Sequence, residues 1–230
     1  MADASHELRT PVAILRGESE VALSQQARTP EEYRESLGVL HHEAERLTHI
    51  VDDLFTLTRA DAGQYPLQTS NFYLDELIAE CVHSARTLAQ AKKISLTFEG
   101  AAESPIHADE SLLRRMLLNL LDNAIKYTPD FGRVTVACRR NGQEYEVSIA
   151  DTGSGILAEL RPRIFERFFR ADKARSRSES DGGGAGLGLA ISSWIAETHH
   201  GRLELTQSDS TGSTFSAYLP ADSGHSLSPG

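Results

Sequence analysis

Apolar side chains at helical spacing run through the first 60 residues and restrict this part of the chain to paired helices. Between residues 6 and 27 they follow three- and four-residue steps, at Leu8, Val12, Leu15 and Ala22. From residue 31 to about 60 the three-four rhythm is stronger, at Leu37, Leu40, Ala44, Leu47, Val51 and Leu54. Because Thr29 and Pro30 interrupt the pattern, it predicts two helices joined by a short turn.

A hairpin of this size has too little core of its own. We therefore expect two copies to pair into a four-helix bundle, which makes the protein a homodimer. Only five residues precede His6, so the first helix is expected to be truncated and to fray around His6. The overhanging second helix would then leave Leu54, Phe55 and Leu57 without their usual packing partners.

The chain changes character after residues 61–66, where Gly63 and Pro66 mark a helix stop. We predict a helical dimerisation domain at 1–62, a linker at 63–70, an α/β domain at 71–220 and a disordered tail at 221–230. Asp75 and Asp109 are expected to cap two helices. Hairpins are predicted around Asn141 and between residues 202 and 219, so the fold class is a helical hairpin followed by an α/β sandwich.

Charge and hydropathy exclude several classes of partner. With a formal net charge of −10, the chain is not expected to bind nucleic acid, because phosphate backbones attract clustered Lys and Arg. No apolar run approaches the roughly 20 residues that cross a bilayer, so direct membrane contact is not expected. Cys81 and Cys138 lack metal-site or disulfide spacing and are predicted to be reduced core residues.

The first segment with chemical potential is residues 5–11, Ser-His-Glu-Leu-Arg-Thr-Pro. On a helix, His6 and Thr10 lie one turn apart, with Glu7 beside the histidine. A neutral imidazole attacks through one ring nitrogen while an acceptor holds the other, so Glu7 is a candidate to fix the tautomer and take the proton. From these residue types alone, an ordinary surface histidine near a helix start remains an equal alternative.

A second segment places four polar side chains on one side of a leucine-rich helix: Asn119, Asn123, Lys126 and Tyr127. Carboxamide oxygens suit Mg²⁺, the ammonium group suits phosphate oxygens and the aromatic ring suits a purine face. Asparagine is disfavoured in the interior of a helix, so the presence of two asparagines in this helix suggests a functional role. Taken alone, the segment also fits polar decoration of a helix end.

Two glycine-rich segments follow the leucine-rich helix. In residues 151–155, Asp-Thr-Gly-Ser-Gly, the glycines permit a tight turn and Asp151 can accept a hydrogen bond from an exocyclic amine such as that of adenine. Residues 182–189 open a helix and can bring backbone amides to phosphate oxygens. The spacing matches neither a Walker loop nor a dinucleotide fingerprint. The intervening residues 171–181, rich in Arg and Ser, are interpreted as a mobile lid.

In order along the chain, these segments resemble the H, N, G1, F and G2 boxes of bacterial sensor histidine kinases, with residues 164–170 matching the F box. The resemblance covers about residues 1 to 220. It implies a dimerisation and phosphotransfer domain followed by an ATP-binding domain of the Bergerat (GHKL) type, which uses ATP and Mg²⁺. The implied catalytic residues are His6, Glu7 and Thr10. The implied nucleotide-binding residues are Asn119, Asn123, Lys126, Tyr127, Asp151, Gly153, Gly155, Arg170, Gly184, Gly186, Leu187 and Gly188.

The resemblance further implies roles for individual side chains. Asn123 would hold Mg²⁺, Asn119 and Lys126 would face the phosphates, Tyr127 would pack on adenine and Asp151 would bind its amino group. Arg170 would reach toward the phosphates.

The family's activity is autophosphorylation of the histidine, here His6, followed by transfer to an aspartate of a response regulator. Thr10 suggests that the regulator is also dephosphorylated. The fragment is expected to be cytoplasmic and its parent protein membrane-anchored. The alternative is a dimeric docking module whose kinase activity is impaired by the truncated first helix.

Overall fold

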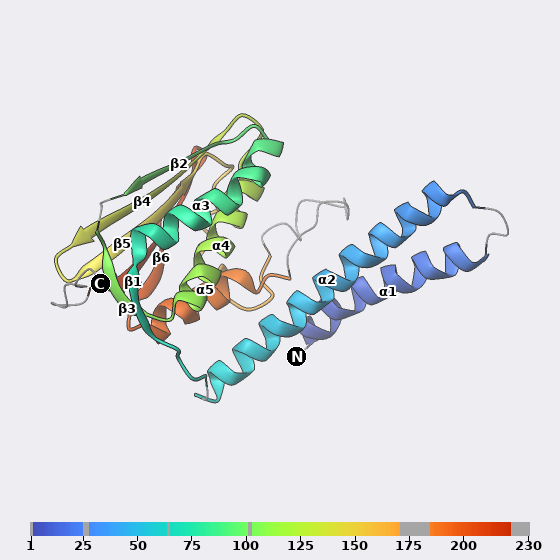
Figure 1. The fold of residues 1–230 in the computed structure, drawn as a ribbon, viewed down its shortest axis with the longest axis horizontal. Coiled ribbons are helices and arrows are strands. Elements are labelled where there is room, and N and C mark those ends of the chain that lie inside the picture. The colour runs from blue at the N-terminus through green and yellow to red at the C-terminus, as the bar shows by residue number, and fades with distance from the viewer. Residues whose placement is uncertain (1, 25–27, 64, 101–102, 171–184, 222–230) are drawn as a thin grey trace.

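The chain folds into a long helical hairpin and a mixed α/β domain, as Figure 1 shows. The computed structural model describes residues 2–24, 28–63, 65–100, 103–170 and 185–221, and the side chains of residues 2–6 lie outside that description. The predicted fold class is confirmed. The predicted tail lies almost entirely outside the described residues. Within them, no helix combines the length and apolarity needed to span a bilayer.

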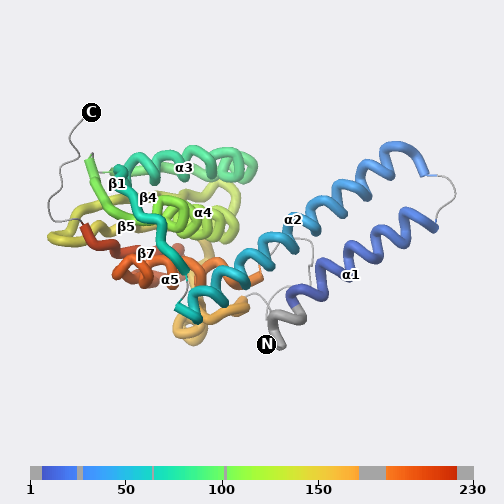
Figure 2. Tube along the Cα trace, turned by 60° about the horizontal axis from the view of Figure 1, so that its bottom comes forward, coloured from blue at the N-terminus to red at the C-terminus, as the bar shows by residue number. Residues whose placement is uncertain are grey.

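The hairpin pairs α1 (Ala2–Ser24) with α2 (Pro30–Asp61), which run antiparallel (Figure 2). A capping box starts α2. The Thr29 hydroxyl accepts a hydrogen bond from the Glu32 amide at 3.2 Å, and the Thr29 amide donates to the Glu32 carboxylate at 2.7 Å. Pro30 occupies the first turn, where its missing N–H costs no helical hydrogen bond. Local chemistry thus explains the break that the sequence predicts.

A five-stranded sheet in the order β2-β4-β5-β7-β6 forms one layer of the α/β domain. Its strands are β2 (Ser95–Gly100), β4 (Arg133–Asn141), β5 (Glu144–Asp151), β6 (Arg202–Asp209) and β7 (Gly212–Pro220). Strands β2 and β4 pair in parallel, and the other neighbours pair antiparallel. A small second sheet pairs β1 (Ser70–Tyr73) with β3 (Pro105–Ala108). Both hairpins predicted from the sequence are present, at β4–β5 and β6–β7.

Three helices form the other layer, on one face of the sheet (Figure 1): α3 (Leu74–Ala91), α4 (Glu110–Tyr127) and α5 (Gly188–Thr198). A short 3-10 helix, η1 (Arg161–Arg163), follows β5. Alternate residues of β5 point into the core, where Tyr145, Val147 and Ile149 are each at most 2% exposed. Burial of this apolar layer fixes α4, the leucine-rich helix, against the sheet.

One predicted helix cap is confirmed and one is wrong. Asp109 caps α4 through its side chain, which accepts a hydrogen bond from the Leu112 amide at 3.2 Å. Helix α3 instead begins at Leu74 with Tyr73 as its N-cap residue. Asp75 lies inside the first turn, and its carboxylate accepts from the Ser104 amide at 2.9 Å. The acidic side chain therefore serves a neighbouring loop rather than its own helix.

The carboxyl-terminal end of α2 packs against the α/β domain. Leu57 is 2% exposed within the shared hydrophobic core, so the expectation that it lacks a partner is wrong. Phe55, in contrast, is 63% exposed. Polar contacts cross the same junction: Arg115 of α4 donates hydrogen bonds to the Thr56 hydroxyl and the Asp53 carboxylate. Packing between domains, which the apolar pattern of α2 alone does not encode, buries Leu57.

Candidate functional site

The first predicted segment lies at the end of the hairpin that faces the α/β domain (Figures 1 and 2). His6 belongs to α1, but its side chain lies outside the described residues. Glu7 is 7% exposed, whereas Thr10 is exposed. The carboxylate next to His6 therefore points away from bulk solvent, and the hydroxyl one turn later is accessible.

Helix α4 carries the second predicted segment on its less buried side. Met116, Leu120 and Leu121 face the core, each at most 2% exposed, while Asn119 and Asn123 are half-buried. The Asn119 side-chain nitrogen approaches the Gly188 carbonyl oxygen at 3.4 Å. Two predicted segments, 69 residues apart, thus meet at the start of α5.

At the end of α4, Lys126 is half-buried and Tyr127 is 45% exposed. The Lys126 ammonium lies 5.5 Å from the centre of the Tyr127 ring, a cation–π distance. Both side chains line a cavity, described below. The helix end therefore presents a cation and an aromatic face together.

The third predicted segment begins at the end of β5. One oxygen of Asp151, Oδ1, accepts hydrogen bonds from the Gly153 amide at 2.7 Å and the Ser213 amide at 3.2 Å. Burial raises the pKa of Asp151, although these two hydrogen bonds act to lower it. Because both amides bind Oδ1, the carboxylate is held in one orientation. Sequence reasoning missed Ser213, since only the fold brings β7 to this loop.

Gly153 and Gly155 are required by close approaches of the backbone. A Cβ atom on Gly153 would lie 2.5 Å from the carbonyl oxygen of Tyr127. One on Gly155, whose φ is +66°, would overlap the carbonyl oxygen of Asp209 in the β6–β7 turn. The glycines therefore let α4, β5 and the β6–β7 hairpin converge.

Only residues 185–189 of the fourth predicted segment, 182–189, lie within the described part of the chain. Gly184 and the predicted lid lie outside the described residues. The Gly186 carbonyl accepts a hydrogen bond from the Phe168 amide at 2.9 Å, which joins this segment to the F box. Leu187 is 1% exposed, and Gly188 is the first residue of α5. Arg170 is half-buried and is the last described residue before the gap at 171–184.

A cavity of about 600 Å³ lies beside the end of α4. Three predicted residues line it, Lys126, Tyr127 and Gly153, together with Lys92, Thr128, Pro129, Asp130, Thr152, Ser154 and Ser210. The cavity is shallow and wide open to solvent. Asn119, Asn123 and Asp151 do not line it. Among the described residues there is no group of three His, Cys, Asp or Glu that could hold a metal ion.

Comparisons with known proteins agree with this geometry. Residues 108–223 match the model of the histidine kinase-, DNA gyrase B- and HSP90-like ATPases, and residues 1–63 match the His Kinase A (phospho-acceptor) domain. The chain belongs to the sensor histidine kinase family. The sensor-like histidine kinase SenX3 of Mycolicibacterium smegmatis is 35% identical over 96% of the chain and 56% of its own length. The chain thus spans about half the length of such relatives.

Solved structures of the family share the fold. The histidine kinase AdeS of Acinetobacter baumannii matches with a TM-score of 0.76 and 23% identity, over 94% of this chain and 98% of its own. The histidine kinase ThkA, solved in complex with the response regulator protein TrrA, matches with a TM-score of 0.75 and 24% identity. This match covers 96% of this chain and 60% of the ThkA chain. The arrangement of the hairpin and the α/β domain in this chain is therefore one that solved histidine kinases share.

Proposed function

We propose that this histidine kinase transfers the γ-phosphoryl group of ATP to its own His6 and then to an aspartate of a response regulator. One observation carries the proposal: a hairpin with His6 at its domain-facing end continues into an ATPase-type domain whose predicted boxes converge. Family membership supports the same activity. The fold resemblance to ThkA, which is solved with a response regulator, supports the partner.

The nucleotide is proposed to lie between α4 and the loop after β5. Tyr127 would pack on adenine, and the free oxygen of Asp151 would accept a hydrogen bond from the adenine amino group. Lys126 and Asn119 would face the phosphates. The amino-terminal end of α5 favours negative charge, which suits phosphate oxygens near Gly186, Leu187 and Gly188. Arg170 and Gly184 are proposed to complete the phosphate contacts.

Magnesium fits a site with few protein ligands. Mg²⁺ in phosphoryl-transfer sites takes one or two protein oxygens and completes its shell with phosphates and water. The Asn123 carboxamide is proposed as the protein ligand, since its oxygen is the type of donor that Mg²⁺ prefers. The bound ion would neutralise charge on the phosphates during transfer.

In the transfer step, one ring nitrogen of His6 bonds to the γ-phosphorus, and the bond from that phosphorus to the bridging oxygen breaks. ADP leaves with the electron pair. Glu7 holds the second ring nitrogen and takes the proton that the imidazole loses. The buried position of Glu7 suits this role, because a carboxylate away from water makes stronger hydrogen bonds.

The hairpin is proposed to form a homodimer through its exposed apolar side chains. These lie on both helices and include Val12, Val21, Leu23, Leu37, Val51 and Phe55, each at least 44% exposed. Exposed apolar side chains on both helices of a hairpin are covered when two hairpins pair into a four-helix bundle. Sedimentation of Leu37→Asp against the wild type tests the dimer, which this charge should weaken.

Two further properties are proposed from the resemblance. Thr10 would position water for dephosphorylation of the regulator, and its exposure suits contact with a second protein. The chain would act on the cytoplasmic side of a membrane as part of a longer sensor, as its length relative to SenX3 suggests. An unchanged rate of regulator dephosphorylation in Thr10→Ala would remove the basis for the Thr10 role.

Incubation with γ-labelled ATP and Mg²⁺ tests the kinase activity. We expect acid-labile, alkali-stable label on the wild type, none on His6→Gln and full label on His42→Gln, an exposed histidine of α2 that serves as the matched control. Acid-stable label would contradict a phosphohistidine. Absence of label with retained regulator binding would identify a docking module instead.

A further inference from the structure

Lys92 follows directly after α3 and extends to the end of α4. Its ammonium group donates hydrogen bonds at 2.9, 2.8 and 2.6 Å to the carbonyl oxygens of Ile125, Lys126 and Thr128. An ammonium group has three N–H donors, and all of them are used here. Lys92 also lines the cavity, but it has no proton left to donate to a ligand.

These hydrogen bonds satisfy a helix end that would otherwise lack donors. The last carbonyls of a helix have no partner within the helix. In α4, the Ala124 carbonyl accepts from the amide and hydroxyl of Thr128, at 3.1 and 2.6 Å. The next two carbonyls accept from Lys92. The positive charge also lies where the helix dipole favours it.

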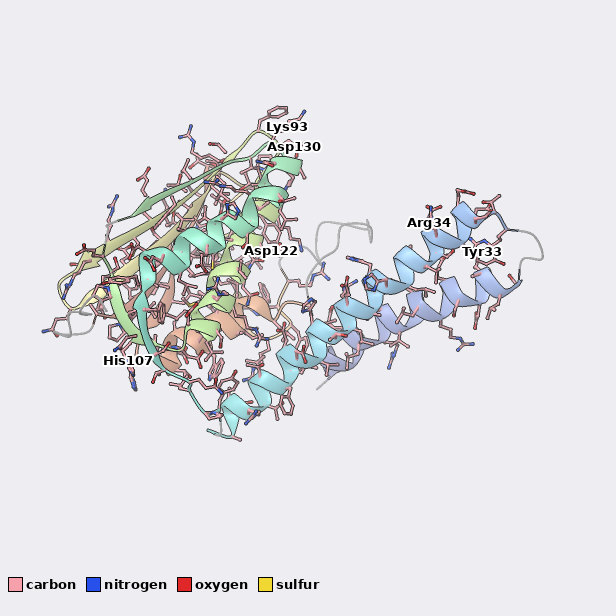
Figure 3. All side chains as sticks on the ribbon, in the orientation of Figure 1. Tyr33, Arg34, Lys93, His107, Asp122 and Asp130 are labelled. Atoms are coloured by element: carbon pink, nitrogen blue, oxygen red, sulfur yellow. The ribbon has the colours of Figure 1, made fainter. Side chains whose placement is uncertain are left out.

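The backbone of the same junction holds the loop that follows α4. The Lys92 carbonyl accepts a hydrogen bond from the Phe131 amide at 3.2 Å, and the Ser95 amide donates to the Gly132 carbonyl at 2.9 Å. Figure 3 shows Lys93 and Asp130 close together at this end of the domain. The segment from Ile125 to Gly132 is therefore bonded to the α3–β2 junction at both of its ends and at Thr128.

This fixed segment contains two of the residues proposed to bind the nucleotide. Lys126 contributes one of the carbonyls that Lys92 binds, and the carbonyl of Tyr127 makes the close contact with Gly153. A shift of the helix end would move both side chains and the loop that carries Gly153. The carbonyls that Lys92 binds include those of Ile125 and Thr128, which are 4% and 1% exposed residues with little access to replacement water.

We propose that Lys92 is a positioning residue for the nucleotide: it sets the end of α4 and so the orientation of Lys126 and Tyr127. The inference rests on the proposed function, because it assigns a role toward the same site. Lys92 would not contact the nucleotide itself, because its three N–H donors bind backbone carbonyl oxygens.

Lys92→Met tests the proposal, because methionine keeps the length of the side chain and removes the three donors. Lys93→Met is the matched control. It removes the same charge from the next residue, whose ammonium lies 4.9 Å from the centre of the exposed Phe131 ring. Binding of a fluorescent ATP analogue with Mg²⁺ and the KM and kcat of His6 labelling are measured for each.

We expect Lys92→Met to raise Kd and KM by about tenfold, in line with the loss of charged hydrogen bonds, and to change kcat by less than about twofold. Lys93→Met should match the wild type, and Lys92→Arg should recover part of the affinity. Hydrogen exchange should show lost protection in residues 128–132 of Lys92→Met only. Wild-type affinity in Lys92→Met, or an equal loss in Lys93→Met, would overturn the proposal.

If Lys92→Met does not fold, Thr128→Val provides the test. The substitution is nearly isosteric and removes only the hydroxyl donor to the Ala124 carbonyl. A higher KM at constant kcat supports the role of the helix end, and an unchanged KM contradicts it. Failure of the wild type to bind any nucleotide would instead refute the proposed function, so the two failures are distinguishable.

Discussion

Asp151→Asn is expected to change nucleotide affinity and stability in opposite directions. In the native protein, Oδ1 accepts both backbone hydrogen bonds, from Gly153 and Ser213, and the other oxygen is left for the ligand. An asparagine can present its single oxygen to the same two amides. Its amino group then takes the place of the second oxygen and meets a donor, the adenine amine, where an acceptor is needed.

The cost to binding is at least one hydrogen bond to a charged group. Such a bond contributes about 1.5–3 kcal/mol, because the partner left behind is poorly solvated. This corresponds to a Kd for ATP that is roughly tenfold to a hundredfold higher. The loop itself should keep its conformation, since both amides retain an acceptor.

The effect on stability follows from the pKa of Asp151, which burial raises above the usual value of an aspartate. A raised pKa means that the folded state binds the proton more tightly than the unfolded state. The ionised carboxyl therefore opposes folding above its folded pKa, and the opposition disappears as pH falls below the unfolded value. Without nucleotide, Asp151→Asn should be more stable than the wild type at pH 7, and the difference should shrink toward pH 4.

Titration of a fluorescent ATP analogue and urea unfolding at several pH values measure the two effects. Asp122→Asn is the matched control, because it removes an exposed carboxylate from α4 (Figure 3) and should leave both unchanged. Asp151→Ala should lose affinity and stability together, since its two amides lose their acceptor. Wild-type affinity in Asp151→Asn would refute the adenine contact. Lower stability of that variant at pH 7 would refute the argument from burial.

Substitutions at four positions test the packing around the site. Gly155→Ala should lower the unfolding free energy by about 1–3 kcal/mol and weaken nucleotide binding, because the methyl group overlaps the Asp209 carbonyl; unchanged urea midpoints would contradict this. Met116→Ala should lower the free energy of unfolding by about 2–5 kcal/mol, since the Met116 side chain is 0% exposed. A loss below about 1 kcal/mol in urea unfolding would show that the surrounding core closes the cavity that the substitution leaves. A double-mutant cycle with alanine at Arg115, at Asp53 and at both should give a coupling free energy of about 1 kcal/mol in urea unfolding, because the two side chains are only 28% and 25% exposed. Additive effects of the two substitutions would show that this interdomain ion pair does not stabilise the chain.

Features encoded by neighbouring residues were predictable from the sequence. The Asn141-Gly142 turn, with φ of +64° at the glycine, joins β4 and β5 as its residue types require. The cap at Asp109 and the helix break at Thr29 likewise depend on atoms within three residues. The same holds for the helical register of α4, which brings Asn119 and Asn123 to one side.

Features that depend on distant contacts were not predictable from one sequence. Asp75 has the residue type of a helix cap, but the approach of Ser104 gives its carboxylate another partner. Leu57 is buried in the core that α2 shares with the α/β domain, and the apolar pattern of α2 alone does not predict this contact. Lys92 bonds to carbonyls 33 to 36 residues away, whereas lysines directly after a helix usually indicate only an exposed helix end.

Backbone contacts between distant segments hold the region of the proposed nucleotide site together. The Tyr127 carbonyl packs on Gly153, and the amides of Gly153 and Ser213 orient Asp151. Backbone contacts of this kind respond together when one segment moves, because they share the loop after β5. A substitution at Lys92 or in the β6–β7 turn should thus affect the same affinity as a substitution at Asp151, and such pairs should be non-additive.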